Sequence, residues 1–267
     1  MENIRQIAKL NPRYSEIVRE ERNYAAVLYH ALMDRDNLRT FLSQIGITDG
    51  VTEDFGVYFE YSMLRDLWNQ IDDNAIDANA VKRDIIRGFL RMDGIADILQ
   101  KDVYEINRFF GVAGNPSRDC IQYPGRWAMA KYDPNIPDTD NEGFLRTCRF
   151  KWAFNIKPDL VIHLSKDRAV CIEAKYESGE GSYPGSEREK AIFKRRGLPG
   201  VGQLDIQRYM MTELLGIQTD FVYLVFDGST PPQNGVLTIT WREAFLHINT
   251  SGYASFLRDM LRNVQVL

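Results

Sequence analysis

The chain has 267 residues, of which 44% are apolar and 26% are charged, and its net charge is −4 at pH 7. This composition is close to that of an average globular protein, so it excludes a collagen, a coiled coil and a wholly disordered chain. The length suffices for one large domain or two small ones, and the net negative charge argues against a protein that simply coats nucleic acid.

Cysteine usage and hydropathy indicate the cellular compartment of the protein. The three cysteines are odd in number and lack the CxxC spacing of a zinc site. This pattern favours a reducing compartment over a disulfide framework. The first residues have no apolar signal segment, and no stretch is apolar for long enough to span a bilayer. We therefore expect a cytoplasmic protein that does not enter a membrane.

The first 143 residues are expected to be mostly helical. Apolar residues at spacings of three and four predict a helix over about 14–33 and its continuation to a stop at Gly46. Further helices are predicted at 53–70, 78–100 and 102–110. Residues 111–143 contain four prolines and several glycines, which is typical of a turn-rich connection.

From Phe144 the pattern changes to that of strands. Strands are predicted over 144–156, 159–164 and 169–176, with the loop "LSKDR" joining the last two as a hairpin. After an irregular piece, 177–200, we expect a helix over 202–216, strands over 220–228 and 235–241, and a closing helix over 251–264. This order predicts an α/β fold with a central mixed sheet flanked by helices.

Charged residues interrupt the predicted hairpin. Side chains alternate along a strand, so Glu173 and Lys175 share one face, and hairpin pairing brings Asp159 beside Glu173. Two carboxylates held this close repel each other unless a cation lies between them. A hard divalent ion such as Mg²⁺ fits oxygen ligands of this kind, and the nearby amine suits phosphodiester hydrolysis.

The same residues carry a family resemblance. "KPD" at 157–159, followed after thirteen residues by "EAK" at 173–175, resembles the signature of the PD-(D/E)XK nuclease superfamily. The resemblance implies a restriction-endonuclease-like core in which Asp159 and Glu173 bind Mg²⁺ or Mn²⁺ and Lys175 assists catalysis. It covers about 144–226 and, less well, the first helix; 45–143 matches nothing that we can name.

Members of this family often bring an acidic residue to the site from a helix ahead of the motif. On a helical wheel Glu21 lies near the middle of an apolar face formed with Tyr24 and Leu28. An unpaired carboxylate there would be costly, so the resemblance implies Glu21 as a third metal ligand. Glu20 lies toward the edge of that face, and Glu60 is the main rival.

A glutamine from a helix after the motif is the other family feature. Gln203 and Gln207 lie on one stripe of the predicted helix together with apolar residues. The resemblance implies Gln203 as the site residue that orients the water or a phosphate. The family pattern Gln-x-x-x-Tyr is not kept, because Gln207 occupies the fourth following position and the tyrosine is Tyr209.

A charged run between these motifs has two interpretations. Residues 187–196 contain five basic and two acidic side chains. They form either a solvated helix face or a surface that contacts phosphates. The candidates for nucleic-acid binding are Lys190, Lys194, Arg195 and Arg196.

These observations predict a Mg²⁺-dependent nuclease that hydrolyses phosphodiester bonds, in DNA rather than RNA, through Glu21, Asp159, Glu173, Lys175 and Gln203. We expect residues 1–143 to form a mostly helical region, whose first helix packs on a nuclease-like core over 144–267 in one compact unit. We expect this helical region to control substrate access or to form a homo-oligomer. The alternatives are a structural ion pair, a non-catalytic module that binds nucleic acid or a protein, and a metal-dependent hydrolase of another phosphoester.

Overall fold

The computed structural model describes residues 21–48, 52, 55–92, 94–175, 179–225, 235–255, 257–259 and 262. The chain divides into two compact units, each assembled from separate pieces of sequence. Unit 1 comprises Met1–Glu60, Pro158–Gly179 and Asp220–Leu267, and unit 2 comprises Tyr61–Lys157 and Glu180–Thr219.

Unit 1 is built on a mixed sheet. The described strands follow the order β1-β2-β3-β6-β7. Their bounds are Gly56–Phe59 (β1), Leu160–His163 (β2), Arg168–Ala174 (β3), Gln218–Val225 (β6) and Leu237–Thr240 (β7). Strand β2 pairs antiparallel with both β1 and β3, whereas β6 and β7 are parallel. The predicted α/β class with a central mixed sheet flanked by helices is thereby confirmed.

The β2–β3 hairpin forms as predicted. Leu160 lies opposite Ile172 and Ile162 lies opposite Val170. The backbone N–H of Leu164 donates to the carbonyl of Arg168 at 2.9 Å and closes the loop. Because side chains alternate along each strand, these apolar residues share one face and Cys171 and Glu173 share the other.

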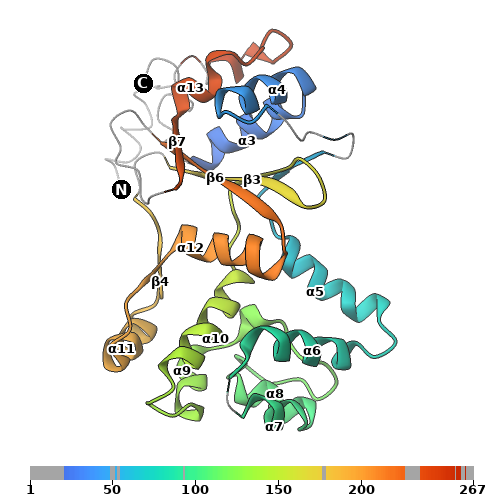
Figure 1. The fold of residues 1–267 in the computed structure, drawn as a ribbon, viewed down its shortest axis with the longest axis vertical. Helices are drawn as coiled ribbons and strands as arrows, with labels where there is room; N and C mark the ends of the chain where they lie inside the picture. The colour runs from blue at the N-terminus through green and yellow to red at the C-terminus, as the bar shows by residue number, and fades with distance from the viewer. Residues whose placement is uncertain are drawn as a thin grey trace, which may run out of the picture. The chain divides into compact units, whose positions relative to one another are not determined.

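Three helices cover one face of this sheet. Figure 1 shows α3 (Glu21–Leu32), α4 (Arg35–Gln44) and α13 (Trp241–Leu246) together on that face, where they share a hydrophobic core with β2, β3, β6 and β7. Helix α4 starts at the cap Asp34, whose carboxylate accepts from the N–H groups of Asp36 and Asn37 at 3.0 Å. The helix predicted over 14–33 is present from Glu21, and residues 14–20 lie outside the described part.

The helix predicted over 53–70 is wrong in its first half. Residues Gly56–Phe59 form β1, and helix α5 (Met63–Asn74) begins only after it. The apolar and aromatic residues of this short run fit either period, so periodicity alone does not separate them. Pairing with β2 decides for a strand, because Val57 lies opposite Ile162 from a distant part of the sequence.

The strand predicted over 144–156 is also wrong. Residues Asn141–Ala153 form helix α10, in which Phe144, Thr147 and Cys148 are buried at helical spacing. The carboxylate of the N-cap residue Asp140 accepts from the N–H of Gly143 at 2.8 Å. The helix runs through residues 143 and 144, where the sequence places a boundary between two regions, and that division into domains stays a prediction.

The piece predicted to be irregular, 177–200, contains regular structure where it is described. Ser186 caps helix α11 (Glu187–Arg196) by accepting from the N–H of Glu189. The short strands β4 (Ser182–Tyr183) and β5 (Val201–Gly202) pair antiparallel on either side of it. The capping serine followed three residues later by Glu189 is a helix signal that the glycines and prolines obscured.

The helix predicted over 202–216 has two parts. An α-helical part, α12 (Gln203–Arg208), continues as a π-helix, η3 (Tyr209–Leu214). The closing helix predicted over 251–264 falls partly outside the described residues, although 255, 257–259 and 262 are helical.

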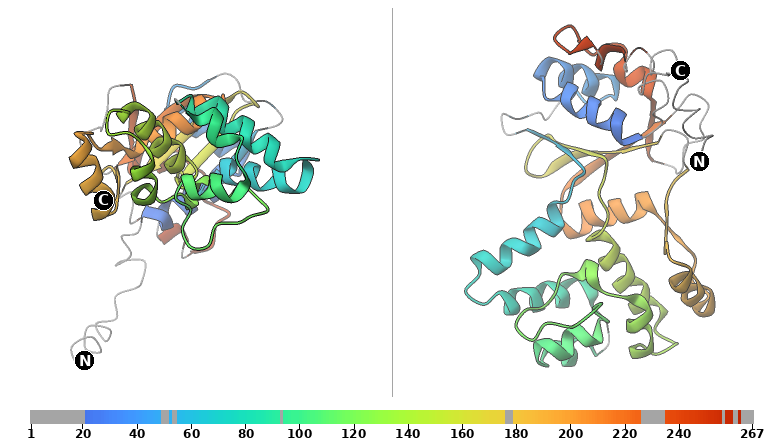
Figure 2. Two further views of the ribbon diagram at one scale, coloured as in Figure 1. Left: turned by 90° about the horizontal axis from the view of Figure 1, so that it is seen from below. Right: turned by 180° about the vertical axis from the view of Figure 1, so that it is seen from behind.

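Unit 2 is mostly helical (Figure 2). Besides α5 and α10–α12 it contains α6 (Ala78–Leu90), α7 (Ile95–Leu99), α8 (Val103–Phe109), α9 (Met129–Tyr132) and two short 3-10 turns, η1 (Pro124–Arg126) and η2 (Asp133–Asn135). The single helix predicted over 78–100 is interrupted because Arg91 and Gly94 both adopt left-handed backbone angles.

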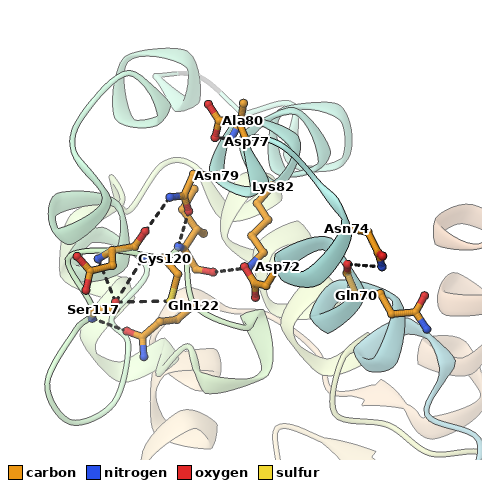
Figure 3. A network of polar contacts seen from close by, with 12 residues as sticks. Gln70, Asp72, Asn74, Asp77, Asn79, Ala80, Lys82, Ser117, Cys120 and Gln122 are labelled. Carbon is orange, nitrogen blue, oxygen red and sulfur yellow. Dashed lines mark hydrogen bonds and ion pairs between the residues drawn. The ribbon is translucent and has the colours of Figure 1, made fainter.

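Side chains order the turn-rich connection (Figure 3). The amide of Asn79 donates to the carbonyl of Asp119 at 2.8 Å and accepts from the N–H of Ile121 at 2.8 Å. The buried ammonium of Lys82 binds the carboxylate of Asp72 at 2.5 Å and the carbonyl of Ile121 at 3.3 Å. Helix α6 thus satisfies backbone groups of a segment that has little regular structure of its own.

A buried arginine at the end of α11 connects two other parts of unit 2. The Nε atom of Arg196 donates to Asp133 at 2.6 Å, and its Nη2 atom donates to the carbonyl of Ile136 at 3.1 Å. Its guanidinium group also lies over the ring of Phe144, 4.5 Å from the centroid. These contacts hold η2, α10 and α11 together.

We expect Arg196→Ala to destabilise the protein strongly, by about 3 kcal/mol, because the buried carboxylate of Asp133 would lose a paired charge. Urea denaturation followed by circular dichroism measures the change. Lys194→Ala on the same helix is the matched control, because Lys194 is exposed, and it should change stability by less than about 0.5 kcal/mol. Equal stabilities of the two variants would contradict the role given to Arg196.

Candidate functional site

The predicted motif residues lie at one end of the β2–β3 hairpin in unit 1. Asp159 directly precedes β2, and the strand register places it opposite Glu173, the penultimate residue of β3. The Oδ2 atom of Asp159 accepts a hydrogen bond from the backbone N–H of Ala174 at 2.9 Å. This bond fixes the carboxylate of Asp159 against the strand that carries Glu173.

Lys175 joins two of the predicted acidic residues. Its Nζ atom lies 2.5 Å from Oε1 of Glu173, which is only 1% exposed, and 3.7 Å from Oε1 of Glu21 on α3. The structure therefore brings Glu21, Glu173 and Lys175 together from two elements far apart in sequence. Helix α3 contributes the acid that the sequence placed on its inward face.

The backbone of Lys175 is held at both of its polar groups. Its N–H donates to the carbonyl of Leu224 on β6 at 2.7 Å. Its carbonyl accepts from the indole Nε1 of the buried Trp241, at the start of α13, at 2.8 Å. Sequence reasoning missed Trp241, because its role depends on a contact across the sheet and no local pattern marks it.

The electrostatics of the cluster favour a protonated Asp159 over an ionised one below neutral pH. Burial, and then the negative charge of Glu173, raise the pKa of Asp159 from 3.8 to about 7, and the hydrogen bond from Ala174 and the charge of Lys175 offset only part of this. Burial acts to lower the pKa of Lys175, but the charges of Glu173, Glu21 and Asp159 outweigh it and raise that pKa. Lys175 is therefore a cation at neutral pH.

Glu60, the rival for the additional acid, also lies beside the motif. Its backbone N–H donates to the carbonyl of Asp159 at 3.0 Å, and its φ of 50° is in the left-handed region. Its carboxylate binds Nε of Arg22 on α3 at 2.7 Å. Glu21 has the direct contact with Lys175, whereas Glu60 is occupied by Arg22. The second choice, Glu20, lies outside the described residues.

Gln203 belongs to unit 2, and its place in the site stays a prediction. It is the first residue of α12, and its N–H donates to the carbonyl of Gly181 at 2.8 Å. Its side chain packs directly over Gly181, where a Cβ atom would lie 2.5 Å from Oε1. The glycine thus leaves room for the amide, and Gln207 is fully buried one turn later.

The basic candidates on α11 differ in their surroundings. Lys190 and Lys194 are exposed, and Lys190 binds Glu187 at 2.8 Å. Arg195 is exposed and pairs with Asp133 and Asp138. Arg196 is buried and uses its donors within unit 2. Arg196 is therefore not available to bind nucleic acid, whereas Lys190, Lys194 and Arg195 remain candidates.

The donor chemistry of the cluster suits a hard divalent ion, but the described residues do not form a complete cage. Carboxylate oxygens are the ligands that Mg²⁺ prefers. In the described part of the chain, however, no three His, Cys, Asp or Glu side chains are grouped to hold a metal ion. Instead the ammonium of Lys175 lies on Glu173, so a divalent ion would compete with it for this carboxylate.

Comparison with protein-family models, curated proteins and solved structures finds no match to this chain. Within the described residues, none of the helices has the length and apolar character needed to cross a membrane.

The raised pKa of Asp159 predicts a pH-dependent stability. The folded chain holds this proton more tightly than the unfolded chain, so ionising Asp159 costs stability as the pH rises from about 4 to about 7. Asp159→Asn removes that cost. With EDTA present, its melting temperature should therefore exceed that of the wild type by more at about pH 8 than at about pH 5.

The control for this measurement is Asp167→Asn, which changes an exposed carboxylate in the hairpin loop. Its difference from the wild type should be small and independent of pH. A difference for Asp159→Asn that does not grow with pH would contradict the raised pKa.

Proposed function

We propose that this protein is a metal-dependent nuclease that hydrolyses phosphodiester bonds, in DNA rather than RNA. The observation that supports it most is the arrangement around Lys175: an ammonium group 2.5 Å from the buried Glu173 and 3.7 Å from Glu21, beside an Asp159 whose pKa is raised to about 7. A structural ion pair needs one acid, whereas three carboxylates around one amine create a site with surplus negative charge that can accept a divalent cation.

A restriction-endonuclease-like core is part of this proposal. Its support is the mixed sheet, the β2–β3 hairpin that carries Asp159 and Glu173, and helix α3 that brings Glu21 to the end of that hairpin. The free thiols of the cysteines fit a reducing compartment such as the cytoplasm.

In this proposal Asp159, Glu173 and Glu21 would hold Mg²⁺ or Mn²⁺. Such an ion lowers the pKa of water and offers positive charge to phosphoryl oxygens. The protonated amine of Lys175 donates hydrogen bonds to a phosphoryl oxygen and stabilises the charge that develops as water forms its bond to phosphorus and the bond to the leaving oxygen breaks. The backbone of Lys175 is held by Leu224 and Trp241, so only its side chain would have to move from Glu173 toward the phosphate.

The nucleic-acid surface in this proposal uses Lys190, Lys194 and Arg195. All three are exposed on α11. Contacts of this kind neutralise phosphates without reading sequence, so binding should weaken as the salt concentration rises.

Cleavage assays test the proposed activity. Wild type, Asp159→Asn and Lys175→Met are incubated with supercoiled plasmid, linear duplex, single-stranded DNA and RNA, with Mg²⁺, Mn²⁺ or EDTA. We expect metal-dependent cleavage of DNA that both variants reduce by about 100-fold or more, because Asp159→Asn removes a metal ligand and Lys175→Met removes the amine that contacts the phosphate.

The matched controls are Asp167→Asn and Lys166→Ala, which change exposed charges in the loop of the same hairpin. They should cleave like the wild type. Cleavage that survives Lys175→Met would contradict the site, and nucleic-acid binding without cleavage, insensitive to EDTA, would favour the non-catalytic module.

A second prediction does not depend on activity. Because the carboxylates repel each other, Mg²⁺ or Mn²⁺ should stabilise the folded wild type, and the melting temperature should rise with metal concentration. Asp159→Asn should lose most of that rise, whereas Asp167→Asn should keep it. Equal stabilisation of both variants would place the bound metal elsewhere.

A further inference from the structure

Unit 2 contains a cavity of about 520 Å³ that the proposed nuclease site does not use. Helix α10 forms one wall, the end of α6 another, and the π-helix η3 a third. The volume lies in the range of small-molecule sites. All the residues that line the cavity belong to unit 2, so the site is defined by that unit alone.

Two unusual backbone features meet at this cavity. Arg91, the C-cap of α6, has φ 38° and ψ 45°, a left-handed conformation that non-glycine residues seldom adopt. Tyr209 and Glu213 come from the π-helix, a form that occurs mostly as single turns and often at functional sites. Both features are costly, and both direct side chains to the same space.

The wall from α10 carries two arginines and one glutamate, Glu142. Leu145 and Arg149 are separated by four residues and so lie on one side of the helix, with Arg146 next to them. Arg146 is already held, because it donates to Glu142 at 2.5 Å and to the carbonyl of Leu90 at 3.3 Å. Arg149 is different: its Nε atom is buried and has no hydrogen-bond partner among the described residues.

Arg149 lines the cavity, and among the described residues no hydrogen bond or ion pair holds its guanidinium group, so its outer nitrogens can donate to a ligand. Leaving such a donor buried without a partner costs more than an ordinary hydrogen bond gains. The acceptor that suits a fork of arginine donors is a planar or tetrahedral oxyanion, and phosphate is the commonest. Arg91 can join it, because among the described residues its side chain makes one hydrogen bond, from Nε to the carbonyl of Gly88 at 3.0 Å.

The rest of the lining suits a flat aromatic group. The ring of Phe89 is half-buried, and its centroid lies 6.1 Å from that of Phe150. Phe89 also lines the cavity. Burial, and then the charge of Glu213, raise the pKa of Tyr209 to about 12, so its hydroxyl stays a hydrogen-bond donor. Glu213 is exposed at the rim and can accept from an amino group on a ring.

We propose that this cavity binds a nucleotide, with its phosphate on Arg149 and Arg91 and its base against Phe89 and Tyr209. Aromatic rings and guanidinium planes are the usual stacking surfaces for bases outside a duplex. The nucleotide is either a free mononucleotide or one unit of a single strand. The proposal does not require the nuclease activity, since none of these residues belongs to the Asp159 cluster.

Calorimetric titration of the full chain tests the proposal, with adenosine 5′-monophosphate, inorganic phosphate and a short single-stranded oligodeoxyadenylate as probes. We expect saturable binding of the mononucleotide or of the oligonucleotide, and weaker binding of phosphate alone. Arg149→Ala and Phe89→Ala should each weaken binding by about tenfold or more, because one removes the charged donor and the other the stacking surface.

Arg87→Ala is the matched control, because Arg87 is an exposed arginine of α6 that pairs with Asp84 outside the cavity, and this variant should bind like the wild type. Arg149→Lys keeps the charge and should recover part of the affinity, which separates loss of the contact from loss of folding. The melting temperatures of all variants show whether each variant is folded. Binding that Arg149→Ala leaves unchanged, phosphate that binds as tightly as the nucleotide, or no binding of any probe would overturn the proposal.

Discussion

The contact between the Lys175 ammonium and the buried Glu173 carboxylate is the interaction on which the site in unit 1 depends. A carboxylate that is 1% exposed requires a partner, since burying an unpaired charge is prohibitively costly. Lys175 supplies the positive charge, which also attracts the carboxylates of Glu21 and Asp159. Loss of this amine would leave three carboxylates whose repulsion opposes the packing of α3 against the hairpin.

The surrounding fold holds the backbone of Lys175, while Glu173 and Glu21 bind its amine. Strand β6 binds the N–H of Lys175 and the Trp241 indole binds its carbonyl, so the residue is restrained on both sides of its Cα atom. Asp159 is restrained in turn by the N–H of Ala174. These contacts fix the backbone positions from which the side chains of the cluster extend.

The sequence allowed the hairpin and its charged residues to be predicted, because alternation along a strand and a short polar loop are local signals. The register then confirmed that Asp159 lies opposite Glu173. Periodicity does not distinguish helix α10 from a strand, because its apolar residues also fit an alternating pattern. The signal for a helix is its N-cap, Asp140. Strand β1 and the burial of Arg196 depend on partners distant in sequence, which no local pattern reveals.

The anchoring of Lys175 has a consequence for the order of events during synthesis. The motif residues are made before Leu224 and Trp241, which hold the backbone of Lys175 and lie further along the chain. A nascent chain that has exposed "EAK" therefore lacks both anchors until most of the protein has been made. The proposed site would therefore be held in its folded geometry only after Trp241 has been made.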